Sequence, residues 1–258
     1  MKPLNPKIAD WAGKNVWLVG ASSGIGAALA SELGRRGAVL CLSARRLAPL
    51  EESLHGASKG SMAIALDVTD AKAVQNATDQ LLGHWGHIDL VVWLAGTYHP
   101  LQVSSFSLEK AVETVNANIV GPLNGLAALL DPMTSGRCRG LAMVSSVAGY
   151  RGLPQSMVYG PTKAAITNLT ESLYLDLHAS GVGIWVINPG FVETALTSKN
   201  QFKMPALLKP DEAATAIIDG FADGVFEIHF PKRFTRSLKL LRTLPYRWYF
   251  AAMRRATK

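Results

Sequence analysis

Short apolar runs alternate along this chain with longer segments in which apolar residues recur every three or four positions. The apolar runs cover residues 16–19, 39–42, 62–66, 88–94, 141–144, 184–187 and 225–230. Their near-continuous hydrophobicity is typical of strands in a parallel sheet that is covered on both faces. The segments between them have helical spacing, as in Ile25, Leu29 and Leu33. Because strand–helix–strand repeats connect through right-handed crossovers, the alternation predicts an α/β fold: a doubly wound parallel sheet of seven strands with helices on both faces.

The bulk composition predicts one large domain followed by a basic extension. The 258 residues, 48% of them hydrophobic, suffice for a single large core, and no linker interrupts residues 1–230. Residues 231–258 hold nine lysines and arginines and no acidic residue; subtracted from the net charge of +7, they leave −2 for the rest. Cys41 and Cys138 show neither metal-ligand nor disulfide spacing, and the N-terminus lacks the apolar stretch of a signal peptide. We therefore expect a cytoplasmic protein without a metal site.

A glycine-rich turn follows the first predicted strand. It consists of Gly20, Ala21, Ser22, Ser23, Gly24, Ile25 and Gly26. Glycines at such a junction let the backbone approach a pyrophosphate, and the helix that follows offers free N–H groups and the positive end of its dipole. A glycine triplet alone is weak evidence, but its place in the first crossover of an alternating chain predicts a Rossmann-type dinucleotide site.

The end of the second predicted strand indicates which dinucleotide binds. NAD-binding domains commonly place an acidic residue here, where it holds the ribose 2′-hydroxyl. This chain has Ala44 followed by Arg45 and Arg46, and guanidinium groups bind a 2′-phosphate in a bidentate manner. We therefore predict NADP(H), with Arg45 as the main contact. The alternative, a solvated helix start, fits Arg46 better than Arg45.

A tyrosine and a lysine stand four positions apart at the start of a helical segment that runs to Leu177. At that spacing Tyr159 and Lys163 lie on one helix face. A phenol has a pKa of ~10, and a neighbouring ammonium lowers it. Ser146 follows the run 141–144, where its hydroxyl can hold a substrate oxygen while Tyr159 transfers a proton. A Tyr–Lys pair alone is common by chance and would be read as a surface pair.

Together these residues resemble the short-chain dehydrogenase/reductase family. The matching segments are the glycine turn, Asp67-Val68, Leu94-Ala95-Gly96, Asn118 before Gly121, Ser145-Ser146, Tyr159 with Lys163, and Asn188-Pro189-Gly190. They occur in the family's order and spacing over roughly residues 14–230. The resemblance implies a Rossmann-type NADP-binding catalytic domain over 1–230. The composition and spacing of 231–258 predict a basic amphipathic helical extension.

The resemblance also implies a role for each matching residue. Tyr159 is the general acid/base, Ser146 binds the substrate oxygen, and Lys163 holds the nicotinamide ribose and lowers the pKa of the tyrosine. Asn118 helps to hold a proton-relay water. The implied cofactor contacts are Gly20, Ser22, Ser23, Gly24, Ile25, Gly26, Arg45, Asp67, Val68, Ala95, Gly96, Tyr159, Lys163, Pro189, Gly190, Val192 and Thr194. Family members are usually dimers or tetramers built on the two helices that flank the central crevice, so we expect a homodimer or homotetramer.

Two segments depart from the family pattern. The family usually has Thr before the first loop glycine, where this chain has Val19. It usually has Asn-Asn-Ala-Gly after the fourth strand, where this chain has Trp93 and Leu94 before Ala95-Gly96. Since a half-lost buried hydrogen bond costs ~1–3 kcal/mol, the paired replacement by apolar residues indicates a packed substitute at the cofactor cleft.

Other polar and apolar residues allow weaker predictions. His84 and His87 fit a helix end better than a metal site. Tyr98 and His99 follow the fourth strand and either line the substrate pocket or form an ordinary loop. Residues 193–208 correspond to the family's lid over the substrate. The apolar residues in and beside this segment suggest a lipophilic substrate or simple packing on the domain: Phe191, Leu196, Phe202, Met204, Leu207 and Leu208.

The basic extension permits two interpretations. Leu238, Leu241 and Leu244 form an apolar stripe, and Pro245 breaks or kinks the helix before a cluster of aromatic residues and arginines. The extension is either a peripheral anchor at an anionic membrane surface or a segment that packs on the domain or on a dimer mate. A nucleic acid partner ranks behind both, because the sequence contains no recognition module.

These features predict an NADP(H)-dependent oxidoreductase. It transfers hydride between the nicotinamide and a small carbonyl or secondary alcohol substrate. The alternative is a catalytically silent NADP(H)-binding sensor or scaffold. The intact Ser146, Tyr159 and Lys163 argue against that alternative.

Overall fold

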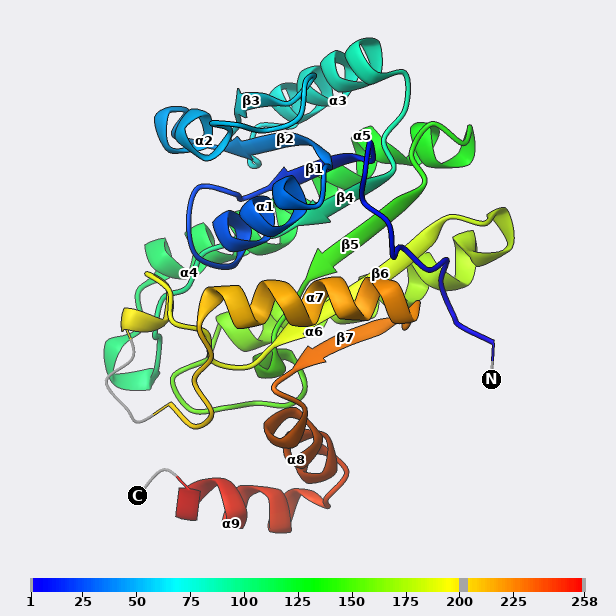
Figure 1. Cartoon of the computed structure of the whole chain (residues 1–258). Coiled ribbons are helices and arrows are strands. Elements are labelled where there is room, and N and C mark those ends of the chain that lie inside the picture. The colour runs from blue at the N-terminus through cyan, green and yellow to red at the C-terminus, as the bar shows by residue number, and fades with distance from the viewer. Residues whose placement is uncertain (1, 200–203, 257–258) are drawn as a thin grey trace.

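The computed structural model describes residues 2–199 and 204–256. Seven parallel strands form one sheet in the order β3-β2-β1-β4-β5-β6-β7 (Figure 1). The strands are β1 (Asn15–Val19), β2 (Val39–Ala44), β3 (Met62–Ala65), β4 (Leu90–Trp93), β5 (Gly140–Val144), β6 (Gly183–Pro189) and β7 (Glu227–Phe230). The doubly wound α/β prediction is confirmed. Each predicted strand is present, and no strand end is shifted by more than two residues.

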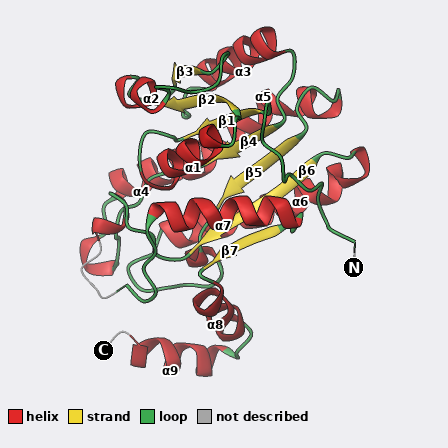
Figure 2. Cartoon of the chain, viewed as in Figure 1, coloured by secondary structure: helices red, strands yellow, loops and turns green. Residues whose placement is uncertain are grey.

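Helices surround the sheet on both sides (Figure 2). They are α1 (Gly24–Arg35), α2 (Ala48–Ser53), α3 (Ala71–Trp85), α4 (Leu108–Val115), α5 (Gly121–Thr134), α6 (Tyr159–Leu177), α7 (Pro210–Asp223), α8 (Lys232–Arg242) and α9 (Tyr246–Ala256). A π-helical turn, Asn116–Val120, joins α4 to α5. His84 lies in the last turn of α3, which ends at Gly86, so the predicted helix end is confirmed.

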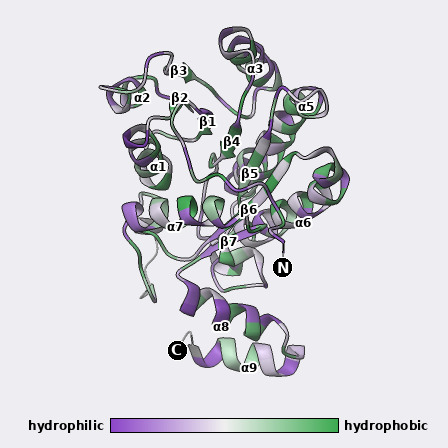
Figure 3. Cartoon of the chain, turned by 45° about the vertical axis from the view of Figure 1, so that its right-hand side comes forward, coloured by the Kyte–Doolittle hydropathy of each residue, from purple (hydrophilic) through white to green (hydrophobic). Residues whose placement is uncertain are grey.

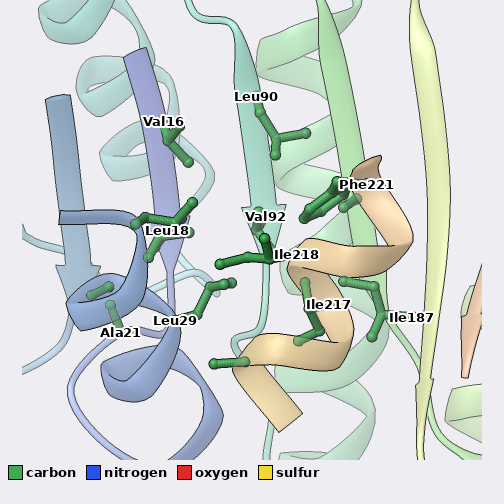
Figure 4. Close-up of a cluster of buried hydrophobic side chains, with 14 of the residues drawn as sticks. Val16, Leu18, Ala21, Leu29, Leu90, Val92, Ile187, Ile217, Ile218 and Phe221 are labelled. Carbon is green, nitrogen blue, oxygen red and sulfur yellow. The ribbon is translucent and has the colours of Figure 1, made fainter. Parts of the chain in front are cut away.

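The sheet separates two apolar clusters because successive strand residues point to opposite faces. Val16 and Leu18 of β1 pack with α1 and α7 on one side, where Leu29, Ile217 and Phe221 complete the layer (Figure 4). On the other side, Trp17 and Val19 pack with α3, α5 and α6. Burial on both faces explains why the strand sequences show no polar alternation.

The N-terminal segment is tied to the far edge of the sheet. The Asn5 side chain donates to the Ile184 carbonyl at 2.7 Å and accepts from the Ile184 amide at 2.9 Å. Trp11 is 2% exposed and packs edge-on against Phe221. Asn5 and Trp11 therefore belong to the core, whereas most residues around them are exposed.

Helices α8 and α9 form the predicted helical extension. They follow β7 and lie beyond the edge of the sheet (Figures 1 and 3). Pro245 stands between the two helices in the chain. Leu238, Leu241 and Leu244 are all partly buried, as the apolar stripe predicts. Among the described residues, no helix is both long and apolar enough to cross a membrane.

Candidate active site

A cavity of about 920 Å³ opens along the carboxyl ends of the central strands. The strand order reverses between β1 and β4, which is the point where doubly wound sheets form a crevice. Every residue predicted to contact the cofactor lines this cavity, from the glycine turn to Thr194. Ser146 lines it as well, whereas Asn118 lies behind its wall.

The glycine turn leaves no room for side chains on its inner side. A Cβ on Gly20 would lie 2.5 Å from the Ala95 amide nitrogen, and one on Gly26 would lie 2.3 Å from the Gly20 carbonyl oxygen. The turn therefore passes tightly against the end of β4. It leads into α1 without an acidic residue in the first turn. This narrow, uncharged cradle at a helix N-terminus fits the pyrophosphate of a dinucleotide.

The end of the cavity beyond β2 and β3 carries three charged residues, Arg45, Arg46 and Asp67. Arg45 and Arg46 are exposed and line it, beside Asp67 after β3. Asp67 Oδ1 accepts hydrogen bonds from the Thr69 amide at 2.9 Å and the Thr69 hydroxyl at 2.7 Å. These bonds, followed by the charge of Arg45, hold the pKa of Asp67 below its usual range. The carboxylate is therefore anchored locally, and the guanidinium of Arg45 faces the cavity without an acidic partner in direct contact.

Tyr159 and Lys163 come from the first turns of α6 and meet Ser146 at the other end of the cavity. Ser146 caps the short helical turn Val147–Gly149, where its hydroxyl accepts from the Ala148 amide at 3.1 Å. Lys163 is 5% exposed; its Nζ lies 5.6 Å from the centre of the Tyr159 ring. Three of the four predicted catalytic residues are thus brought together; the fourth is Asn118.

The ionisation of this pair differs from the sequence-based expectation. Burial raises the pKa of Tyr159 to about 12, although a hydrogen bond with Ser146 acts in the opposite direction. Burial also lowers the pKa of Lys163 to about 8. The predicted lowering of the tyrosine pKa by Lys163 is therefore wrong for the protein alone: the Lys163 ammonium donates to the Val144 carbonyl at 2.9 Å, and desolvation dominates both groups.

Asn118 lies in the π-helical turn, a deviation that is frequent at functional sites. Its Oδ1 accepts from the Thr97 amide at 2.7 Å, and its Nδ2 donates to the Thr97 carbonyl at 2.9 Å and to Thr162 Oγ1 at 3.1 Å. The side chain therefore clamps the segment after β4 to the start of α6. A Cβ on Gly96 would lie 2.9 Å from Asn118 Oδ1, so only glycine fits between this segment and the clamp.

The two departures from the family pattern are resolved by packing. Val19 is 1% exposed and Trp93 is 2% exposed. The Val19 carbonyl accepts from the amides of Leu94 and Ala95, both at 2.8 Å. The backbone thus secures the segment after β4, and the Trp93 ring fills the space beside Gly125 of α5. The prediction of a packed substitute is confirmed.

Tyr98 and His99 are not among the residues that line the cavity, and of the described apolar residues named in and beside the lid segment only Leu196 lines it. Tyr98 packs edge-on against Tyr159, with ring centres 5.0 Å apart, and His99 contacts Glu113 at 2.9 Å. Ala195, Leu196 and Thr197 line the cavity from the lid segment, and Thr194 and Thr197 bond to each other. Phe202 lies outside the described residues.

Several contacts at this site carry no signal in the sequence. The Ser145 hydroxyl donates to the Lys163 carbonyl at 2.6 Å and contacts Thr167, so it fixes β5 to α6. Glu227 accepts from the Tyr150 hydroxyl at 2.6 Å and from the Asn188 amide at 2.9 Å. Only their neighbours in space distinguish these residues from other serines and glutamates.

Comparisons with known proteins agree with this geometry. The sequence profile of the short chain dehydrogenase family matches residues 14–204. An uncharacterised oxidoreductase of Myxococcus xanthus is 33% identical and covers 96% of this chain and 99% of its own length. One of Staphylococcus epidermidis is 31% identical over 78% of this chain and 87% of its own. The chain belongs to the short-chain dehydrogenase/reductase family of oxidoreductases.

Solved structures show the same fold. An alcohol dehydrogenase from Thermococcus sibiricus, complexed with 5-hydroxy-NADP, is 28% identical with a TM-score of 0.74, over 84% of this chain and 96% of its own. A short-chain dehydrogenase from Streptomyces avermitilis has a TM-score of 0.79 at 23% identity, over 88% of this chain and 92% of its own.

Proposed function

We propose that this chain is an NADP(H)-dependent oxidoreductase acting on a carbonyl or secondary alcohol group. The observation that carries the proposal is the cavity itself, which has Arg45 at one end and Ser146, Tyr159 and Lys163 at the other. The glycine cradle lies between them. A single elongated cleft thus joins a phosphate-binding end to a proton-transfer end.

The residues present fit a nicotinamide dinucleotide. The glycine turn and the N-terminus of α1 would hold the pyrophosphate, and Asp67 with Val68 would contact the adenine end. Lys163 would hold the nicotinamide ribose, with the segment from Pro189 to Thr194 beside it. When bound, the cofactor supplies or accepts the hydride.

The protein's own contribution is to position the substrate and to move one proton. Ser146 binds the substrate oxygen, and the Tyr159 hydroxyl donates a proton to it during reduction or removes one during oxidation. The pKa of about 12 for Tyr159 in the protein alone favours the protonated form, which suits donation to a developing alkoxide. Asn118 keeps the segment after β4 and the start of α6 in register, so that Tyr159 meets the substrate at a defined place.

Arg45 supports NADP(H) as the cofactor. Asp67, which lines the same end of the cavity as Arg45, accepts hydrogen bonds from Thr69, and β2 itself ends in Ala44 without an acid. A guanidinium beside the cavity attracts a 2′-phosphate and offers it paired hydrogen bonds. The complex of the Thermococcus relative with an NADP analogue is consistent with this choice.

The substrate proposed here is small and lipophilic, and the assembly a homodimer or homotetramer. Leu196 contributes an apolar wall to the cavity, and Phe191 packs with Phe234.

Exposed apolar residues on α4 and α5, such as Val112 and Leu123, offer a surface for a second copy of the chain. Light scattering of the purified protein measures the assembly directly.

The test is a screen of ketones and aldehydes in which the fall in NADPH absorbance measures turnover. The parent protein is compared with Tyr159→Phe. Loss of the phenolic proton lowers kcat by about 10²- to 10⁴-fold, while NADPH affinity stays within the same order of magnitude. Tyr174→Phe is the matched control, because Tyr174 lies on the same helix but donates to the Leu4 carbonyl, away from the cavity. A Tyr159→Phe protein as active as the parent would reject the mechanism, and a parent that binds NADPH but turns over no substrate would favour a sensor.

A further inference from the structure

Helix α9 is attached to the domain through one of its faces. Tyr249, 2% exposed, donates from its hydroxyl to the Gly152 carbonyl at 2.7 Å. The Arg151 guanidinium lies 4.1 Å from the Tyr249 ring centre and 4.6 Å from that of Tyr246. It also donates to the carbonyls of Arg242 and Leu244, at 2.8 and 2.6 Å. The inner face of α9 is therefore docked on the loop that follows Ser146.

Helix α8 is fixed to the same part of the domain. Lys239 donates to Glu227 at 2.5 Å, and Thr235, fully buried, contacts His229 at 2.6 Å. These contacts fix the orientation of α8 and α9 relative to the edge of the sheet. The interpretation in which the extension packs on the domain therefore applies to the inner side of the two helices.

The opposite side of α9 carries the residues that the domain does not cover. Successive helix residues are about 100° apart, so Trp248 and Phe250 lie on either side of Tyr249, and the arginines lie across the helix from it. Trp248 is 56% exposed and Phe250 52% exposed. We define the outer face of α9 as Arg247, Trp248, Phe250, Arg254 and Arg255, all exposed. Hydrophilic and hydrophobic residues mix along this helix (Figure 3).

We propose that the outer face of α9 binds the surface of a membrane that contains anionic lipids. Aromatic side chains of this type are favoured at the level of the lipid headgroups, and arginines beside them attract acidic lipids. Residues 228–258 contain no acidic residue that would repel such a surface, whereas the remainder of the chain is slightly acidic. The charge therefore favours the approach of this end of the molecule to an anionic surface.

A lipid surface fits this face better than a second copy of the chain. A two-fold contact through the outer face would bring the same arginines of both copies together. Such like-charge contacts are unfavourable, and the face holds no carboxylate to compensate them. An extended layer of acidic headgroups satisfies all three arginines at once, while the two rings enter the interface.

The test is co-sedimentation of the full-length protein with vesicles of phosphatidylcholine alone or mixed with phosphatidylserine. We expect binding only to the mixed vesicles, weakened by salt. Replacing Arg247, Arg254 and Arg255 by Gln lowers the partition coefficient by about fivefold per arginine, hence about a hundredfold. Trp248→Ala with Phe250→Ala also reduces binding, because the inserted apolar area is lost.

The matched control replaces three exposed lysines on other elements by Gln: Lys7, Lys59 and Lys72. It changes the net charge equally, and it should bind like the parent. All variants are checked for an unchanged circular dichroism spectrum, because the substituted residues are exposed. Equal binding of the arginine variant and the parent overturns the proposal. The proposal is also overturned if the parent does not bind the mixed vesicles but forms a dimer, and if this dimer dissociates when Trp248 and Phe250 are replaced by Ala.

Discussion

At the scale of single residues, Lys163 shows how tightly the site is built. Its ammonium donates to the Val144 carbonyl, and its own carbonyl accepts from Ser145. A Cβ on Gly149 would lie 2.7 Å from the Lys163 carbonyl carbon, and one on Gly96 would lie 3.5 Å from its Nζ. Small neighbours, Ser145, Gly149 and Gly96, surround the lysine closely. Its position beside Tyr159 is therefore set before any ligand binds.

Arg45 allows a sharp test of cofactor choice. Arg45→Ala should weaken NADP⁺ binding by about ten- to a hundredfold, because hydrogen bonds to charged groups contribute about 1.5–3 kcal/mol. NAD⁺ lacks the 2′-phosphate, so its affinity should not fall. Isothermal titration calorimetry with both nucleotides measures the change. Arg36→Ala, which removes an exposed arginine paired with Glu32 on α1, serves as the charge control; NAD⁺ binding tighter than NADP⁺ in the parent would refute the assignment.

At the scale of elements, the close approach of α5 to the end of β4 depends on one small residue. Trp93 replaces a polar residue of the family pattern, and its ring occupies the space where a Cβ on Gly125 would stand, 2.2 Å from the ring. The large side chain and the glycine are thus complementary. Helix α5 in turn carries Asn124, which donates to the Val68 carbonyl at 3.0 Å, so this packing places one wall of the cavity.

Two glycine-to-alanine exchanges in helices should have opposite effects. Gly125→Ala should lower the free energy of unfolding by about 1–3 kcal/mol, because the added methyl overpacks the rigid Trp93 ring. A Cβ on Gly83 in α3 would have no neighbouring atom within 4 Å. Gly83→Ala should therefore raise the free energy of unfolding by about 0.5–1 kcal/mol, because alanine has the higher helix propensity. Urea unfolding followed by tryptophan fluorescence compares the two. A neutral Gly125→Ala would mean that α5 moves away from β4 without cost.

At the scale of the whole molecule, the sheet edge and the extension are joined by a polar cluster. The Glu227 carboxylate, at the start of β7, accepts hydrogen bonds from Tyr150, Asn188 and Lys239, which belong to three different parts of the chain. His229 on the same strand contacts Thr235 of α8. The cluster links the loop after Ser146 and the end of β6 to the C-terminal helices, so the extension is part of the folded unit.

His229 should make stability depend on pH. Burial, with Lys239 nearby, lowers its pKa from 6.5 to about 4, against the opposing charge of Glu227. Between these values the unfolded chain binds a proton that the folded chain does not, so the free energy of unfolding falls as the pH drops from 6.5 toward 4. The slope is at most about 1.4 kcal/mol per pH unit for one proton.

The measurement is urea unfolding at a series of pH values across this window. His229→Gln should flatten the dependence, because the titrating group is gone. His55→Gln, which changes an exposed histidine after α2, should leave it unchanged. The same slope in the parent and His229→Gln would assign the acid sensitivity to other groups.

The sequence by itself determined the number and type of the strands, the glycine turn and the pairing of Tyr159 with Lys163 on one helix, because these depend on short-range patterns. A strand buried on both faces needs an apolar run, and a pyrophosphate cradle needs glycine at a strand end. Tyr159 and Lys163 share a helix face by their spacing alone. Arg45 was recognisable because it follows β2 directly.

Only the tertiary structure decided the contacts between residues far apart in the chain. The clamp of Asn118 on Thr97, the fit of Trp93 against Gly125, and the docking of Tyr249 on Gly152 join segments from 21 to 97 residues apart. No local pattern encodes them, since each depends on the shape of its partner. Burial, which only the folded chain defines, likewise reversed the expected pKa of Tyr159 and separated the inner side of α9 from its outer face.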